Sequence, residues 1–171
     1  MFAIDQPRAR GHELRQENGV LGANQILSAT PFANKACPVV FRDSSMRQIL
    51  AFEHPTDGVQ LVKGGIATGE DGRTAALREL REEAGIANTS IARDLGTWSS
   101  GYEGQIWSLH LCTYLPDLPE VWTHYCHDDG GHELKFFWHD VHTEAGNGWA
   151  PVYRRALAEI RSRTRPLLWR G

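Results

Sequence analysis

The chain has 171 residues, enough for one domain with its own hydrophobic core. Its net charge of −3 leaves no basic footprint for duplex nucleic acid. No apolar run approaches the roughly 18–20 residues that span a bilayer, and the first nine residues lack a signal-peptide core. The three cysteines, Cys37, Cys112 and Cys126, are odd in number and widely spaced, which argues against a disulfide framework and fits a reducing cytoplasm.

In chain order, the predicted elements are strands on either side of a central helix, with a second helix at the end. Residues 1–30 are polar and weakly patterned, so we predict a tail, or a short helix over 13–18. Runs rich in β-forming residues predict strands at 36–42, 47–52, 59–62, 90–98, 106–114 and 134–138. Helices are predicted at 74–84 and 152–163, and the Pro-, Asp- and His-rich stretch 115–131 is predicted to be a long surface loop. This order favours an α/β fold with helices on both faces of a mixed sheet.

Residues 64–86 place a glycine-rich turn directly before an acidic helix. Strong helix formers fill 74–84 without an internal Gly or Pro, and Gly85 stands where a left-handed cap would end the helix. A stripe of apolar residues, Ala76, Leu80 and Ala84, suits close packing on a sheet. Three carboxylates stand at i, i+3 and i+4 and therefore share one face: Glu79, Glu82 and Glu83.

These three carboxylates favour a metal site. Like charges at i,i+4 destabilise a helix by a few tenths of a kcal/mol, so a helix that keeps them usually holds a cation. All-oxygen clusters suit Mg²⁺, which binds through a few carboxylates, waters and substrate phosphates. The glycines next to Lys63 would let the backbone approach the metal and the phosphates closely. The competing interpretation is a solvated helix face on which Arg78 pairs with Glu82.

The spacing decides between these interpretations. The order Gly64, five residues, Glu70, seven residues, Arg78-Glu79-Leu80, one residue, Glu82-Glu83, one residue, Gly85-Ile86 resembles the Nudix box at every fixed position. A chance match has a probability on the order of 10⁻⁷ at average residue frequencies. The chain is therefore identified as a member of the Nudix hydrolase family.

The resemblance implies the Nudix fold, an α/β/α sandwich around a mixed β-sheet. The Nudix hydrolase domain would span 31–165, between an N-terminal tail or short helix at 1–30 and a C-terminal tail at 166–171. The implied reaction is attack of water, assisted by Mg²⁺ or Mn²⁺, on a diphosphate linkage of a small-molecule nucleoside diphosphate derivative. The protein would act as a monomer or homodimer.

The resemblance also assigns roles to residues. The metal-binding glutamates would be Glu79, Glu82 and Glu83, one of which would be the general base, and which one stays open. Arg78 would orient a glutamate, Glu70 would support the turn, and the Lys63 backbone carbonyl would be a further metal ligand. Many members add a glutamate after the box: Glu133 is the first candidate here, followed by Glu103 and Glu120. A solvated strand-entry residue is the competing interpretation of Glu133.

Substrate contacts are expected from the turn and from two later aromatic residues: Lys63, Gly64, Gly65, Tyr102 and Trp107. Tyr102 lies 17 residues beyond Gly85, near the place of a base-contacting tyrosine in members that cleave dinucleoside polyphosphates or RNA 5′ ends. Ser100 stands where ADP-ribose-cleaving members have a proline. A dinucleoside polyphosphate is therefore one candidate substrate, while core or surface roles stay open for both aromatics.

Two other classes of function stay open. A Nudix-fold module that senses a nucleotide without cleaving it would not need three clustered carboxylates. A zinc-binding interaction protein would be centred on 124–132, which contains His124, Cys126, His127 and His132. This segment lacks a second pair of zinc ligands unless His110 and Cys112 reach it.

Overall fold

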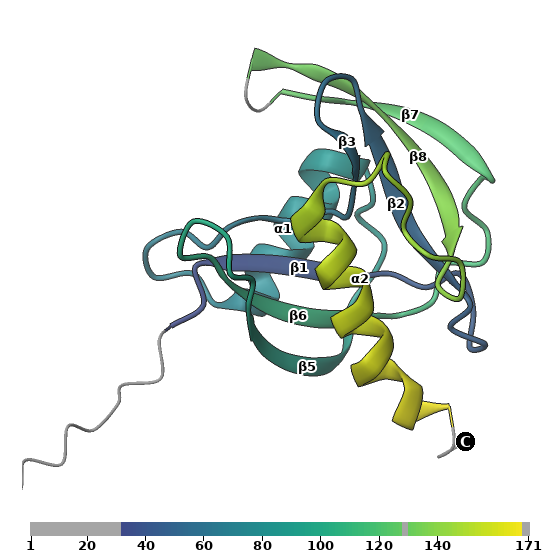
Figure 1. The fold of residues 1–171 in the computed structure, drawn as a ribbon. Coiled ribbons are helices and arrows are strands. Elements are labelled where there is room, and N and C mark those ends of the chain that lie inside the picture. The colour runs from purple at the N-terminus through teal and green to yellow at the C-terminus, as the bar shows by residue number, and fades with distance from the viewer. Residues whose placement is uncertain (1–31, 128–129, 169–171) are drawn as a thin grey trace, which may run out of the picture. The chain divides into compact units, whose positions relative to one another are not determined.

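The structure is a computed structural model that describes residues 32–127 and 130–168. The described part holds eight strands in two four-stranded sheets and two α-helices (Figure 1). The first sheet has the order β4 (Gly64–Gly65), β1 (Lys35–Val39), β6 (Ile106–Cys112) and β5 (Ile91–Ser99). The second sheet has the order β3 (Gly58–Gln60), β2 (Gln48–His54), β8 (His132–Asp140) and β7 (Val121–Cys126). The helices are α1 (Gly72–Ala84) and α2 (Pro151–Thr164), and α2 continues into the 3₁₀ turn η2 (Arg165–Leu167).

Among the strands of the described residues, one pair is parallel. β1 runs parallel to β6, whereas β4 pairs with β1, and β5 with β6, in the antiparallel sense. The second sheet is antiparallel throughout. The predicted α/β class with mixed pairing is confirmed, but the strands divide between two sheets.

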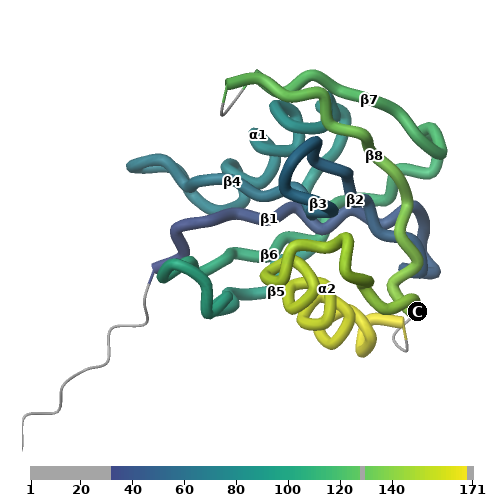
Figure 2. Tube along the Cα trace, turned by 45° about the horizontal axis from the view of Figure 1, so that its top comes forward, coloured from purple at the N-terminus to yellow at the C-terminus, as the bar shows by residue number. Residues whose placement is uncertain are grey.

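Alternating side chains place the two helices on opposite faces of the sheets. Val39 and Ile49 belong to the core cluster that receives α2, whereas their neighbours Val40 and Leu50 belong to the cluster that receives Leu80 of α1. This follows from the two-residue period of a strand, which sends successive side chains to opposite faces. Figure 2 shows strands of both sheets between α1 and α2. Two large hydrophobic clusters, with a small third one at Ala36, Ala75 and Ala76, thus hold the layers together.

Local chemistry sets the ends of α1. The Asp71 side chain accepts hydrogen bonds from the backbone N–H groups of Arg73 and Thr74, both at 2.9 Å, so the helix begins earlier than the predicted Thr74. Gly85 ends the helix with a φ of 72°, and its N–H donates to the Arg81 carbonyl at 3.1 Å. The predicted cap is confirmed, as is the predicted Ala76–Leu80–Ala84 stripe, which is buried.

The longest element that the sequence did not predict is β7. The stretch 115–131, predicted to be a surface loop, contains β7, which pairs with β8 along its length. Trp122 points inward and stacks on Phe136 of β8, with ring centroids 5.1 Å apart. The Pro, Asp and His residues at both ends of the stretch obscured the alternation of exposed Val121, Thr123 and Tyr125 with inward-facing neighbours.

The predicted tail or helix in residues 1–30 lies outside the described residues. Within 32–127 and 130–168, neither helix has the length and apolar character needed to cross a membrane.

Candidate active site

Arg78 organises the turn before α1. Its guanidinium donates to both carboxylate oxygens of Glu70 at 2.9 Å and to the Gly65 carbonyl at 2.7 Å. It also donates to Glu79 at 2.7 Å and to Glu82 at 2.8 Å. The hydrogen bonds from Arg78 hold the pKa of Glu70 below its ordinary value, and Glu70 in turn raises the pKa of Arg78. The pairing of Arg78 with Glu82 is therefore one part of a network that fixes the turn on the helix.

Glu79 and Gly64 are in close contact. Glu79 is 5% exposed. A Cβ atom added to Gly64 would lie 1.8 Å from the carboxyl carbon of Glu79, so only glycine leaves space for this carboxylate. The Lys63–Gly64 backbone consequently passes beside the Glu79 carboxylate. This proximity is required if the Lys63 carbonyl and Glu79 are to bind the same cation.

Glu83, one turn beyond Glu79, lines a cavity of about 140 Å³. Residues from both helices, from the strands of the second sheet and from the segments after β2 and β3 line the cavity. Its lining consists of Phe52, His54, Asp57, Gln60, Lys63, Glu83, Cys126, His132, Leu134 and Tyr153. It therefore combines one box glutamate with a lysine, two histidines and a tyrosine around an apolar wall.

The Lys63 ammonium group is half-buried on this wall. Its Nζ lies 5.5 Å from the centroid of the Trp107 ring, a cation–π distance. Burial lowers the pKa of Lys63 from its ordinary value, a shift to which Lys35 adds and which Glu83 opposes. Lys63 thus lies in the same cavity as Glu83, and in its protonated form it would attract a phosphate group.

The donor set fits a divalent cation that keeps other ligands. Glu79 and Glu83 stand one turn apart on one face, and both are at least partly buried. Glu82 is exposed and bound to Arg78. In the described residues no group of three or more His, Cys, Asp or Glu side chains is close enough to hold a metal. A hard cation bound here would take two carboxylates and complete its shell with water and phosphate oxygens, as Mg²⁺ prefers.

The two aromatic candidates lie in different places. Tyr102 is 45% exposed, in the loop between β5 and β6. Trp107 is fully buried and packs edge to face on Trp98 with ring centroids 5.3 Å apart. Neither lines the cavity. Trp107 instead contacts two residues that do line the cavity, Lys63 and Tyr153.

The three candidates for a further glutamate are not brought to the cavity. Glu133 is exposed on β8, and because His132 and Leu134 line the cavity, Glu133 points to the opposite face of the strand. Glu120 pairs with Arg42 at 2.5 Å. Glu103 lies beside Tyr102 in the exposed loop. A role for any of them as a ligand stays a prediction.

The histidines of 124–132 have separate environments. The Nε2 atom of His124 lies 3.1 Å from the Glu82 carbonyl, and the imidazole packs against Gly85 at the end of α1. His132 turns to the cavity and contacts the His54 ring edge to face at 4.6 Å. Zinc binding in this segment stays a prediction, and part of the segment, residues 128–129, lies outside the described residues.

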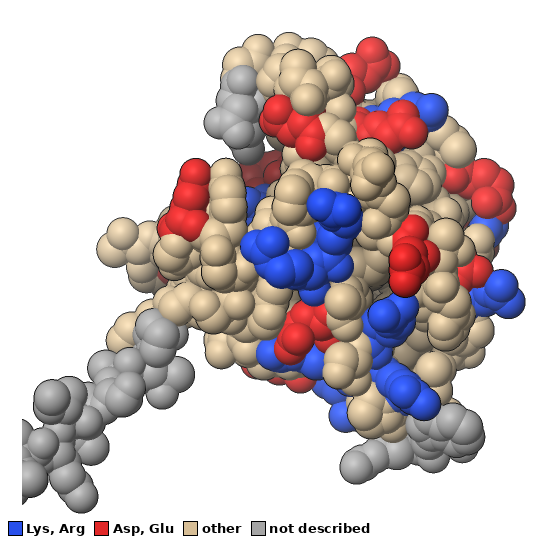
Figure 3. Space-filling model, viewed as in Figure 1, with Lys and Arg blue, Asp and Glu red and all other residues tan. Residues whose placement is uncertain are grey.

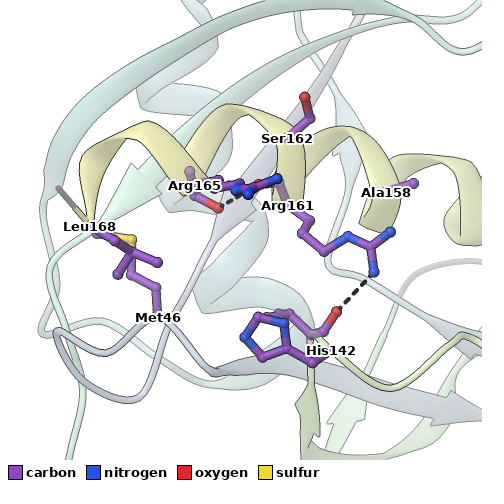
Figure 4. Close-up of a pocket in the computed structure, with 9 residues that line it drawn as sticks. Met46, His142, Ala158, Arg161, Ser162, Arg165 and Leu168 are labelled. Atoms are coloured by element: carbon purple, nitrogen blue, oxygen red, sulfur yellow. Dashed lines mark hydrogen bonds between the residues drawn. The ribbon is translucent and has the colours of Figure 1, made fainter.

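A larger hollow, about 640 Å³, lies at the other end of α2 (Figure 4). Its lining includes Met46, Val141, His142, Arg161 and Arg165, and contains no carboxylate. One of its arginines is already bound, because Arg161 donates to the Val141 carbonyl at 3.5 Å. The smaller cavity, which contains Glu83, is therefore the better candidate for the active site.

Sequence reasoning missed most of this cavity. Tyr153 comes from a segment far from the box, whereas His54, Asp57 and Gln60 lie shortly before it, and no local pattern marks any of the four. His132 was noted only as a zinc candidate. These residues come together only in the folded chain.

Comparison with known proteins agrees with this geometry. The family model of the NUDIX domain matches residues 34–159. "Nudix hydrolase 25" of Arabidopsis thaliana is 44% identical over 39 residues, a match that spans 23% of this chain and 22% of that protein. The chain thus aligns with about a fifth of the length of this curated relative.

Solved structures show the same fold at low identity. The E. coli ORF135 protein has a TM-score of 0.54 at 23% identity, over 78% of this chain and 90% of that chain. A UDP-X diphosphatase has a TM-score of 0.53 at 14% identity, over 85% and 65%. The E. coli dihydroneopterin triphosphate pyrophosphohydrolase has a TM-score of 0.50 at 17% identity, over 75% and 97%. With a complete Nudix box over residues 64–86, the predicted α/β architecture and a family model that matches most of its length, the chain belongs to the Nudix hydrolase family.

Proposed function

We propose that this protein is a divalent-metal-dependent pyrophosphohydrolase that cleaves a diphosphate linkage in a nucleoside diphosphate derivative. The observation that carries the proposal is the placement of Glu79 and Glu83 on consecutive turns of α1, one beneath Gly64 and the other in a cavity with Lys63. The relatives' names agree with this chemistry, because they include a UDP-X diphosphatase and a pyrophosphohydrolase.

In this proposal the residues of the site have separate roles. Glu79 and Glu83 would hold Mg²⁺ or Mn²⁺ together with the Lys63 backbone carbonyl, and Glu82 would join them on leaving Arg78. The bound cation would supply charge neutralisation and a lowered pKa of water. Arg78 keeps the glutamates oriented through its network, with Glu70 as its anchor. Lys63, with the backbone at Gly64 and Gly65, would bind the phosphates. The exposed Tyr102 would contribute to the nucleoside side, whereas the buried Trp107 would act only through its contacts with Lys63 and Tyr153.

Replacing Glu83 by glutamine tests the proposal. Glu83→Gln keeps the size of the side chain but removes a negative charge and a possible general base. We expect turnover with Mg²⁺ to fall by about 10²–10⁴-fold, the range for loss of general acid–base catalysis, with little change in the melting temperature. Turnover is measured as release of two phosphate-bearing products from a panel that includes a nucleoside diphosphate sugar, ADP-ribose and a dinucleoside tetraphosphate.

The matched control is Glu144→Gln, at an exposed position in the turn after β8. It should leave turnover unchanged. A Glu83→Gln protein as active as the wild type would contradict the proposal. The alternative, a nucleotide-sensing module, predicts tight metal-dependent binding of the same compounds without turnover by the wild type, and the panel separates the two.

A further inference from the structure

A tyrosine from the second helix reaches the cavity that holds Glu83. Tyr153 lies in the first turn of α2 and lines the cavity together with Glu83 and Lys63. It is 7% exposed, and its ring packs against Trp107 with the centroids 5.5 Å apart. Its position is therefore fixed by a helix and by the core rather than by a loop.

The hydroxyl group of Tyr153 has hydrogen-bonding capacity to spare. Among the described residues nothing forms a hydrogen bond with it, and its oxygen is not among the polar atoms cut off from solvent. Buried tyrosine hydroxyls normally have a partner. A tyrosine hydroxyl is protonated at neutral pH and can donate a hydrogen bond. A ligand in the cavity would be its partner.

The neighbours of Tyr153 indicate what that ligand offers. A neutral O–H donor beside the Lys63 ammonium group suits an anionic oxygen, because hydrogen bonds to charged acceptors are the stronger kind. The volume of about 140 Å³ suits a compact group rather than a whole nucleotide. We infer that Tyr153 is a substrate-binding residue whose hydroxyl donates a hydrogen bond to a diphosphate oxygen beside Lys63 and Glu83. This inference rests on the proposed function.

Binding of a diphosphate analogue tests the contact without any turnover. The probe is methylenediphosphonate, which cannot be hydrolysed at its P–C–P bridge, titrated with Mg²⁺ into the wild type and into Tyr153→Phe. We expect Tyr153→Phe to bind the probe about 10–100-fold more weakly, the range for one hydrogen bond to a charged group. The control Tyr114→Phe, at a half-exposed residue outside the cavity, should bind as the wild type does. Unchanged affinity in Tyr153→Phe would overturn the inference.

A second measurement leaves Tyr153 in place. The chain has four tyrosines, so a protein labelled with 3-fluorotyrosine gives four fluorine signals. Single substitutions at Tyr102, Tyr114 and Tyr125 by phenylalanine assign three of them and leave the fourth to Tyr153. Saturation with the probe and Mg²⁺ should move the Tyr153 signal and leave that of Tyr114 in place. A Tyr153 signal that stays in place at saturation would also overturn the inference.

The outcomes distinguish this inference from the proposed function. If the wild type cleaves no compound of the panel, the proposed function fails, while probe affinity and the fluorine signal still decide whether Tyr153 contacts a diphosphate. If Glu83→Gln loses turnover but Tyr153→Phe binds the probe and turns over as the wild type does, only the inference on Tyr153 fails.

Discussion

At the scale of single residues, the site depends on how closely the turn approaches the helix. Because Gly64 has no side chain, the Glu79 carboxylate can occupy the space beside it. Arg78 connects that carboxylate to Glu70 and to the Gly65 carbonyl. The guanidinium of Arg78 thus offsets the negative charges of three glutamates that would otherwise repel one another, Glu70, Glu79 and Glu82. Arg78 thereby neutralises part of the acidic face of α1, the face that we propose binds the metal.

The close approach at Gly64 can be tested against its neighbour in sequence. Gly64→Ala should lower the free energy of unfolding by about 1–3 kcal/mol, the cost of forcing atoms into a packed site. Gly65→Ala is the matched control, because a Cβ atom there would meet no atom within 4 Å. Urea unfolding of both variants measures the difference. Equal stability of the two variants would show that Glu79 moves aside without cost.

At the scale of elements, α1 and α2 are attached to the sheets by different means. α1 is attached by its buried stripe of Ala76, Leu80 and Ala84 and, at its end, by Gly85, which packs against His124 of β7. α2 is fixed along its length. Arg163 donates to the carbonyls of Leu95 and Thr97 on β5 at 2.7 and 2.9 Å. Figure 3 shows Lys and Arg gathered over α2, and part of this basic surface is therefore structural.

The cap of α1 gives a prediction at this scale. Gly85 has a φ of 72°, and a Cβ atom there would lie 2.8 Å from the Nδ1 atom of His124. Gly85→Ala should cost about 1–2 kcal/mol for the left-handed conformation alone. Gly146→Ala serves as the comparison, since its added Cβ meets nothing within 4 Å and its φ is not in the left-handed region. Thermal and urea unfolding should show a loss for the first variant only.

At the scale of the whole molecule, α1 and the first sheet meet over a buried histidine. His110 on β6 is 2% exposed, and its Nε2 atom lies 2.8 Å from the Ser108 hydroxyl. A Cβ atom on Gly72, the first residue of α1, would lie 2.9 Å from the same nitrogen. Burial lowers the pKa of His110 from its ordinary value, with Arg73 adding to the shift and Asp94 opposing it. The neutral imidazole is therefore part of the interface between helix and sheet.

This burial predicts how stability depends on pH. Because the folded protein holds His110 neutral, the unfolded chain binds the extra proton as the pH falls below about 6.5, the ordinary pKa of histidine. The stabilisation is thus present above that pH and is lost below it, with a slope of at most about 1.4 kcal/mol per pH unit for one proton. His139, whose pKa burial also lowers, should add to the slope.

Two variants isolate the contribution of His110. His110→Gln should flatten the decline in the free energy of unfolding between pH 7 and pH 5, because the titrating group is gone. Ser108→Ala removes the hydrogen-bonding partner but keeps the imidazole, so it should lower stability at every pH and leave the slope in place. Urea unfolding at pH 7, 6 and 5 measures both, and an unchanged slope in His110→Gln would contradict the prediction.

Local signals in the sequence were sufficient for most elements. The periodicity around Ala76, Leu80 and Ala84 gave α1 its buried face, and Gly85 gave its end, because helix pitch and left-handed caps depend only on neighbouring residues. The strand pair 90–98 and 106–114 was found within a few residues of β5 and β6 for the same reason. The strand β7 was missed because Trp122, one of its inward-facing residues, is buried by a long-range contact with Phe136 of β8, which no local pattern records.

The sequence alone determined the chemistry of the box, since the spacing of Glu79, Glu82 and Glu83 on one helix is a local property. Only the tertiary structure decided which of these carboxylates is buried, which is bound to Arg78 and which enters the cavity. It alone brought Tyr153 of α2 beside Lys63 and Glu83. The physical reason is that a cavity is formed by packing between segments distant in the chain, and no periodicity within one segment records which residues will face it.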